Sequence, residues 1–212
     1  MRIGELSRRT GVPVPTVKYY VREGLLPAGE LTSPNQAHYG DRHERRLRLI
    51  RALLDVGGLS VAAVRDVVAA VDDTGRSVHE VLGEVTDPIV PRCPQGPDDE
   101  VLAAARDRVR ELVDARGWRI DEGNLAATAL AETLAALERA GHGAFAEVLD
   151  DYADAADRVA EADLDHVAKR VALDDVVESV VVGTVLGDAI LTSLRRMAQT
   201  HRSSRLFGDD GA

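Results

Sequence analysis

Cysteine is almost absent from this chain of 212 residues, which contains only Cys93. A single cysteine cannot form an intramolecular disulfide, and it cannot alone build a thiolate metal site, so a soft-metal site would need the cysteine of a second subunit or other ligands. The absence of a disulfide framework is typical of a reducing compartment. The sequence therefore predicts a cytoplasmic protein with no resident metal.

Aromatic residues make up only 3% of the chain, and beyond residue 75 they are Trp118, Phe145, Tyr152 and Phe207. A pocket for an organic ligand needs apolar walls, to which aromatic rings contribute. Trp118, Phe145 and Tyr152 are the candidate ligand-binding residues on this ground. The alternative, that they are core residues of a helical bundle, is the more common role of such side chains.

Long uncharged apolar runs are also missing. The longest apolar stretch, residues 176–194, carries Glu178 and Asp188, so it predicts a buried helix rather than a membrane span. No N-terminal segment has the pattern of a signal peptide, and no membrane partner is expected. Gly183 and Gly187 in this stretch permit close helix approach, and its broad apolar face suits either the centre of a bundle or a dimer interface.

Catalytic patterns are lacking as well. The sequence has no nucleophile and base arrangement, no phosphate-binding glycine loop and no clustered metal ligands, so it predicts neither an enzyme nor a cofactor. Asp150, Asp154, Asp157 and Glu161 would share one helix face, where a hydrated surface is the ordinary interpretation and a hard-metal site the alternative. The six histidines are scattered over positions 38, 43, 79, 142, 166 and 201.

Positive charge, in contrast, is concentrated at one end of an acidic chain. The formal net charge is -10, yet residues 1–54 carry ten basic and five acidic side chains, a net +5 that leaves -15 for the remainder. A local positive field is enough to attract phosphates, because charges are screened beyond about 8 Å at physiological salt. The N-terminal part is therefore the candidate nucleic-acid-binding end.

Helical patterns extend over nearly the whole chain. Residues 2–9 and a segment beginning at Pro15 predict two short helices around a glycine-containing turn, which is the helix-turn-helix pattern. Residues 25–39 predict a short hairpin or loop, because they contain prolines, glycine and asparagine. Two further helix starts are indicated, one by the D-x-x-E pattern of residues 41–44 and one by Ser60 as a cap.

A proline-rich segment divides the chain. Prolines at 88, 91, 94 and 97 favour an extended spacer, although their spacing also fits a PxxP ligand. The fold is predicted to be mainly α, with an N-terminal module at 1–75, a linker at 76–99 and an all-helical effector or dimerisation domain at 100–207. Helices are predicted in the last part at residues 101–116, 122–140, 143–162, 164–172 and 174–200.

Three spaced motifs in the N-terminal module resemble those of one family. They read RIGELSRRTGVPVPTVKYYVREGLL from residue 2, NQAHYGD from residue 35 and RLRLIRALLDVGGLSVAAVRDVV from residue 46. In order and spacing they are similar to the motifs of MerR-type transcription regulators, over residues 2 to about 71. The resemblance implies a winged helix-turn-helix DNA-binding domain and a sequence-specific regulator of transcription.

The resemblance also implies that the second helix enters the major groove. Lys18 stands where an arginine is usual, so it offers a point charge without a bidentate fork. Tyr20 matches a tyrosine that bonds a phosphate, although Tyr19 or Tyr20 could instead pack in the core. In the wing, Ala37 replaces the expected arginine, and His38 either takes over its contact or is a surface histidine without a role. The predicted DNA-binding residues are Thr16, Lys18, Tyr19, Tyr20, Arg22, His38 and Tyr39.

The family acts as homodimers on palindromic promoter elements that RNA polymerase then uses. The resemblance therefore implies promoter DNA, a second copy and RNA polymerase as partners. Because the C-terminal part is longer than dimerisation requires, a small organic effector is expected to bind there. Two alternatives stay open, a dimeric regulator without a ligand and a partner-binding helical protein with a degenerate DNA-binding module. The departures at Lys18 and Ala37 support only the second of these.

Overall fold

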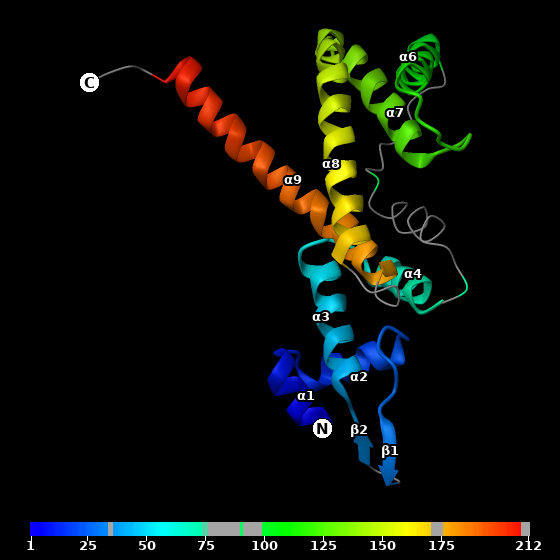
Figure 1. The fold of residues 1–212 in the computed structure, drawn as a ribbon, viewed down its shortest axis with the longest axis vertical. Coiled ribbons are helices and arrows are strands. Elements are labelled where there is room, and N and C mark those ends of the chain that lie inside the picture. Colours follow the sequence, from blue (N-terminus) through cyan, green and yellow to red (C-terminus); the bar gives the residue numbers. More distant parts are fainter. Residues whose placement is uncertain (34–35, 74, 76–89, 91–98, 171–175, 209–212) are drawn as a thin grey trace. The chain divides into compact units, whose positions relative to one another are not determined.

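The chain is mainly α-helical with one two-stranded antiparallel sheet in its described part, as the sequence predicted. It divides into two compact units, residues 1–85 with 171–212, and residues 86–170. Most of the predicted linker at 76–99 lies outside the described residues. The computed structural model describes residues 1–33, 36–73, 75, 90, 99–170 and 176–208 (Figure 1).

The first unit begins with two short helices, α1 (Ile3–Thr10) and α2 (Val14–Arg22). Gly11 follows α1 with a φ of 70°, a left-handed conformation that glycine adopts without steric cost. Leu6 and Val17 are fully buried, one from each helix. Their burial fixes the angle at which α2 leaves the turn.

A hairpin follows, with β1 (Glu30–Ser33) antiparallel to β2 (Gln36–His38). Helices α3 (Asp41–Asp55) and α4 (Val61–Asp72) complete the N-terminal module. Ser60 caps α4 by accepting a hydrogen bond from the Ala63 N–H at 3.1 Å, which confirms the predicted cap.

The start of α3 differs from the predicted D-x-x-E signal. Asp41 is the first helical residue and not the cap, and the N–H of Gly40 donates to Nδ1 of the buried His43 at 3.0 Å. Glu44 pairs instead with Arg9 at 2.9 Å and with Arg48 at 2.5 Å. The carboxylate that the pattern assigned to capping therefore ties α3 to α1.

The long last helix, α9 (Val176–Phe207), packs on α3 and α4 and belongs to the first unit. Its Val181 and Val185 are fully buried. A Cβ at Gly57, in the turn between α3 and α4, would overlap with Cγ1 of Val185 and lie 2.7 Å from the Leu53 carbonyl oxygen. The predicted division at 100–207 placed this helix with the C-terminal part, but the bare turn at Gly57 lets it dock on the N-terminal module.

The second unit contains α6 (Glu100–Arg116), α7 (Leu125–Arg139), a 3₁₀ helix η1 (Gly143–Val148) and α8 (Leu149–Arg170). The predicted break between helices at 143–162 and 164–172 was wrong, because α8 is continuous and its sequence has no glycine or proline to break it. Residues 171–172 lie outside the described residues. No helix in the described ranges is long and apolar enough to cross a membrane. The main core of the unit is formed by Leu102, Ala105, Val109, Ala131 and Ala135.

Asp99 ties the start of α6 to the end of α7. Its carboxylate accepts hydrogen bonds from the Leu102 N–H at 3.0 Å and from Arg139 at 2.7 Å. The bond from Leu102, followed by the bond from Arg139, holds the pKa of Asp99 below its usual value.

Gly57→Ala should destabilise the first unit by about 1–3 kcal/mol, because the added Cβ displaces α9 or strains the turn. Gly4→Ala is the matched control, since no atom lies within 4 Å of a Cβ at that position in α1. Urea unfolding followed by circular dichroism measures both variants. Equal stability of the two variants would show that α9 does not rest on the turn.

The lowered pKa of Asp99 predicts that the protein loses part of its free energy of unfolding in acid. A carboxylate whose pKa is lowered on folding stabilises the protein above the pKa of the unfolded chain, and this contribution is lost as the pH falls through the folded pKa. Asp99→Asn keeps a capping oxygen but does not titrate. We expect its free energy of unfolding to fall less between neutral pH and about pH 3 than that of the wild type. Parallel pH profiles would contradict this role.

Candidate DNA-binding surface

The exposed face of α2 carries three of the predicted DNA-binding residues. Lys18, Tyr19 and Arg22 lie on one side of the helix, because residues three and four apart are neighbours on a helix surface. The guanidinium of Arg22 lies 5.2 Å from the centroid of the Tyr19 ring, a cation–π distance. Among the described residues, Lys18 has no acidic partner. Arg22 also pairs with Glu23 at 3.4 Å, so the face presents one cation that is stacked and ion-paired and one that has no acidic partner.

Tyr20 lies on the opposite side of α2, facing the core. Its side chain is only 5% exposed, and its ring centroid lies 5.9 Å from that of Tyr19. The structure thus adopts the core alternative for one of the two tyrosines. Thr16, one turn before Tyr20, is half-buried and does not share the face of Lys18. Contacts of Thr16 and Tyr20 with DNA remain predictions.

The predicted wing residues lie beside the start of the chain. The terminal ammonium of Met1 donates to the Tyr39 carbonyl oxygen at 2.8 Å and lies 2.5 Å from Nε2 of His38. Tyr39 is buried and packs edge-on against His43, with ring centroids 5.2 Å apart. His38 is exposed and already bonded to a cation, while Tyr39 stabilises the base of the wing.

Two arginines that the sequence analysis did not single out hold this surface in place. Arg65 of α4 donates through Nε to the Glu23 carbonyl oxygen and through its terminal nitrogen to the Glu23 carboxylate, both at 2.9 Å. Arg2 donates to the side chain of Gln36 in the wing at 3.3 Å. These contacts join residues far apart in sequence, so no local pattern could indicate them.

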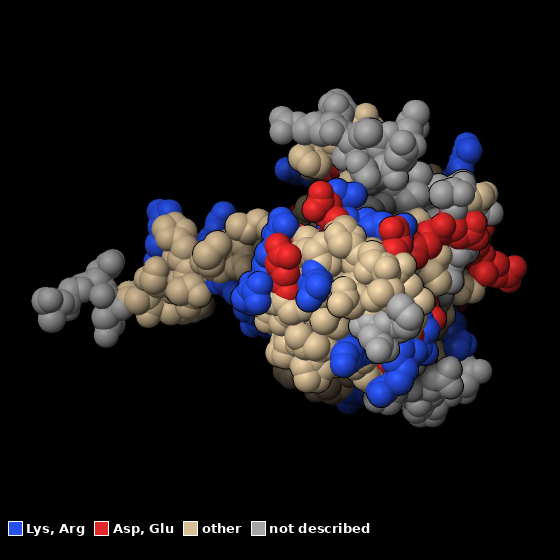
Figure 2. Space-filling model, turned by 90° about the horizontal axis from the view of Figure 1, so that it is seen from below, with Lys and Arg blue, Asp and Glu red and all other residues tan. Residues whose placement is uncertain are grey.

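Arginine and lysine side chains lie at several places around the largely uncharged surface in Figure 2. The exposed cations of the first two helices are Arg2, Arg8, Arg9, Lys18 and Arg22. Of the acidic residues near them, Glu44 is nearly buried and paired with Arg9, and Glu23 is paired with Arg22 and Arg65. Acidic charge is thus partly neutralised at this end of the first unit, which favours approach of a polyanion.

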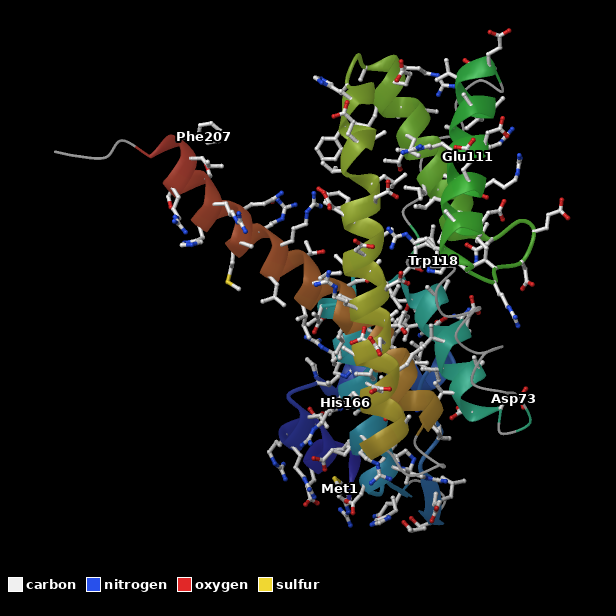
Figure 3. The ribbon with its side chains drawn as sticks, turned by 45° about the horizontal axis from the view of Figure 1, so that its top comes forward. Met1, Asp73, Glu111, Trp118, His166 and Phe207 are labelled. Atoms are coloured by element: carbon white, nitrogen blue, oxygen red, sulfur yellow. The ribbon has the colours of Figure 1, made fainter. Side chains whose placement is uncertain are left out.

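In the second unit, the structure describes the surroundings of the three predicted ligand-binding residues, whose binding role stays a prediction. Nε1 of Trp118 donates to Asp157 at 2.8 Å, and its ring packs against the buried cluster of Leu112, Leu149 and Ala153. Phe145 and Tyr152 form an edge-on pair with centroids 6.3 Å apart, and both are about half exposed. Trp118 is therefore a packing residue, labelled in Figure 3.

The acidic face of α8 is largely ion-paired. Arg116, at the end of α6, donates to Asp154 at 2.5 Å and to Asp157 at 3.4 Å, and it also lies 3.8 Å from Asp150. The hydrogen bond with Asp154 raises the pKa of the Arg116 guanidinium. Within the described ranges, no group of three or more histidine, cysteine, aspartate or glutamate residues is arranged to hold a metal ion. This face ties α8 to α6.

Two grooves flank the pairing of α6 with α7. One has a volume of about 390 Å³, and the other about 530 Å³. The larger has a floor of Val109, Val113 and Ala131, with Arg106 and Asp121 at its rim. None of Trp118, Phe145 or Tyr152 lines either of these two grooves.

Residues 1–71 match the sequence model of a family described as MerR HTH family regulatory protein. The HTH-type transcriptional regulator HmrR of Sinorhizobium medicae (strain WSM419) is 30% identical over 112 residues, which cover 53% of this chain and 71% of that protein. The Heavy metal-dependent transcription regulator 2 of Rhizobium meliloti (strain 1021) is 32% identical over 81 residues, which cover 38% of this chain and 54% of the relative.

A solved structure is similar along the whole chain. It is that of SCO5550 from Streptomyces coelicolor A3(2), described as a transcriptional regulator, with 34% sequence identity and a TM-score of 0.74 over 100% of both chains. The similarity thus extends beyond the N-terminal module to the helical second unit and the last helix.

Proposed function

Because this chain belongs to the MerR family of transcriptional regulators, we propose that it binds a palindromic promoter element as a homodimer, with one α2 in each half-site. The observation that carries the proposal is the exposed face of Lys18, Tyr19 and Arg22. Lysine and arginine side chains on such a helix can neutralise phosphates and donate to base edges in the major groove. RNA polymerase is the partner that would use the promoter so bound.

The contact of Arg65 with the end of α2 supports the same proposal, because it holds the proposed recognition helix in place. By bonding both the carbonyl and the carboxylate of Glu23, it fixes the C-terminal end of α2 to α4. A recognition helix held at its end can present its side chains in one geometry, which reduces the entropy lost on binding. We therefore assign Arg65 a positioning role.

For the second unit we propose a small organic effector. The larger groove beside α6 and α7 has about 530 Å³, a volume within the range of about 300–1,000 Å³ usual for ligand sites. Its apolar floor and charged rim would suit a ligand with an apolar body and polar ends. Since the ring of Trp118 packs against a buried cluster, this groove is a better candidate ligand-binding site than the surroundings of the aromatic residues.

The metal dependence in the name of the Rhizobium meliloti relative is not extended to this chain. A soft-metal sensor holds its ion with several thiolates, and this sequence has one cysteine. Cys93 lies outside the described residues, in the segment predicted as a linker.

Titration of a fluorescent duplex carrying the chain's own upstream promoter region, compared with random duplex at two salt concentrations, tests the proposal. We expect a preference for the promoter of about 10³-fold or more, the low end for specific regulators. Equal, weak and salt-sensitive binding to both duplexes would reject sequence-specific regulation.

Lys18→Ala should weaken promoter binding by about 1–3 kcal/mol and lower the salt dependence by about one counterion if the side chain contacts a phosphate. Arg110→Ala is the matched control, because it removes one exposed cation from the second unit, where Arg110 pairs with Asp107 at 2.8 Å. The control should bind like the wild type. Unchanged affinity of Lys18→Ala, with an intact circular dichroism spectrum, would remove this residue from the interface.

A further inference from the structure

Lysine is rare in this chain, and one of its two lysines lies on the proposed recognition helix. Of the 26 basic side chains, 24 are arginines, and the two lysines are Lys18 and Lys169. Lys18 lies on the exposed face of α2, and Lys169 belongs to α8 of the second unit. A lysine amine is a target of acylation, whereas the guanidinium of arginine stays protonated. Position 18 therefore carries a chemistry that every other basic side chain of the N-terminal module lacks.

The side chain of Lys18 is also free of the contacts that hold neighbouring arginines. Arg9 pairs with Glu44, and Arg65 pairs with Glu23, both at 2.9 Å. Lys18 is exposed, and its ammonium forms no ion pair or hydrogen bond with the described residues. Its Nζ is thus accessible to a reagent in solution, and no protein contact has to break before it reacts.

The charge around Lys18 favours an acyl donor that is itself an anion. Residues 1–54 carry a net charge of +5. Residues 99–170, which include Lys169, carry nine basic and 17 acidic side chains, a net charge of -8. A positive potential raises the local concentration of anions, and a negative potential lowers it. An anionic acyl donor should therefore meet Lys18 more often than Lys169.

We propose that Lys18 is a site of acylation by an anionic acyl donor, either an acyl phosphate or an acyl thioester of a phosphorylated carrier, and that acylation releases the protein from DNA. This regulation rests on the proposed function and acts on the same surface.

The reaction is an acyl transfer that needs no oxidant or reductant. The neutral Nζ of Lys18 attacks the acyl carbonyl carbon, and a C–N bond forms. The C–O bond to phosphate breaks, or the C–S bond in the case of a thioester. Phosphate or thiolate leaves with the bonding electron pair, and the amine proton passes to solvent.

The product removes a charge that the face of α2 does not replace. Acylation converts the ammonium into a neutral amide, which can no longer neutralise a DNA phosphate. The other basic residue of α2 is Arg22, which is stacked on Tyr19 and paired with Glu23. After acylation, α2 retains no cation that is without an acidic partner.

DNA binding and acylation should exclude each other, because both need the free ammonium or amine of Lys18. Linkage then requires that DNA protects Lys18 as much as acylation weakens DNA binding. The promoter duplex should slow acylation of Lys18 and leave the rate at Lys169 unchanged. Equal rates at Lys18 with and without the duplex would contradict the proposed release.

Incubation of the full chain with acetyl phosphate, followed by peptide mass spectrometry, tests the site. Lys18 should be acetylated several-fold faster than Lys169 at low salt, and the preference should shrink at roughly 0.5 M salt, where charges are screened over a few ångströms. The uncharged reagent N-hydroxysuccinimidyl acetate is the control and should show a smaller preference.

A parallel incubation with acetyl-coenzyme A distinguishes the two donor classes, since the donor that reacts at Lys18 is the one the site accepts. Three results would overturn the site: no reaction at Lys18 with either donor, faster reaction at Lys169, or an equal preference for Lys18 with the uncharged reagent.

Promoter binding before and after acetylation tests the consequence, with each protein compared with its own untreated sample. The wild type and Lys169→Arg, once acetylated at Lys18, should bind about tenfold more weakly or worse. Lys18→Arg should bind equally with and without treatment, although it keeps Lys169 and the terminal amine. Loss of binding by treated Lys18→Arg, or unchanged binding by the acetylated wild type, would overturn the proposed release.

The untreated wild type separates this inference from the proposed function. If it prefers its promoter while Lys18 shows no preferential acetylation, the modification site is rejected and the proposed function stands. If it shows no promoter preference, the proposed function fails, and the release from DNA fails with it.

Discussion

The contact between α9 and the bare turn at Gly57 is the constraint on which the first unit depends. Val185 lies where a side chain at Gly57 would be, and Val181 is buried one turn earlier. Interiors pack densely and transmit small shifts, so α9 and the DNA-binding module should respond as one body. Through this contact, whatever α9 binds would set the position of α2. Helix α9 thus belongs to the same packed unit as α2.

Charge is used differently in the two units. On α2, Lys18 has no acidic partner among the described residues, and the guanidinium of Arg22 lies over Tyr19. In the second unit, Arg116 forms ion pairs with Asp154 and Asp157, and these two carboxylates hold α8 against α6. Within the described residues, Lys18 of the N-terminal module keeps an exposed ammonium that can meet a polyanion. An acidic chain can therefore bind DNA through one end.

Local patterns predicted the features that depend on neighbouring residues. The helix-turn-helix and the Ser60 cap could be read from the sequence, because turn and capping chemistry act over three or four residues. The role of Glu44 could not, because its partner Arg9 is on another helix. The docking of α9 and the bond from Arg65 to Glu23 depend on contacts between segments far apart in the sequence. The periodicity of apolar residues does not indicate such contacts. Periodicity did indicate one broad apolar face on α9, but not which part of it is buried.

Hydroxyl-radical footprinting of the wild-type chain on its upstream promoter would test most directly whether two α2 helices read one palindrome. Two protected segments on one face of the duplex, centred about 10 base pairs or a multiple of one helical turn apart, are expected from paired recognition helices. A single protected segment, or uniform weak protection along the duplex, would contradict a dimer that reads two half-sites.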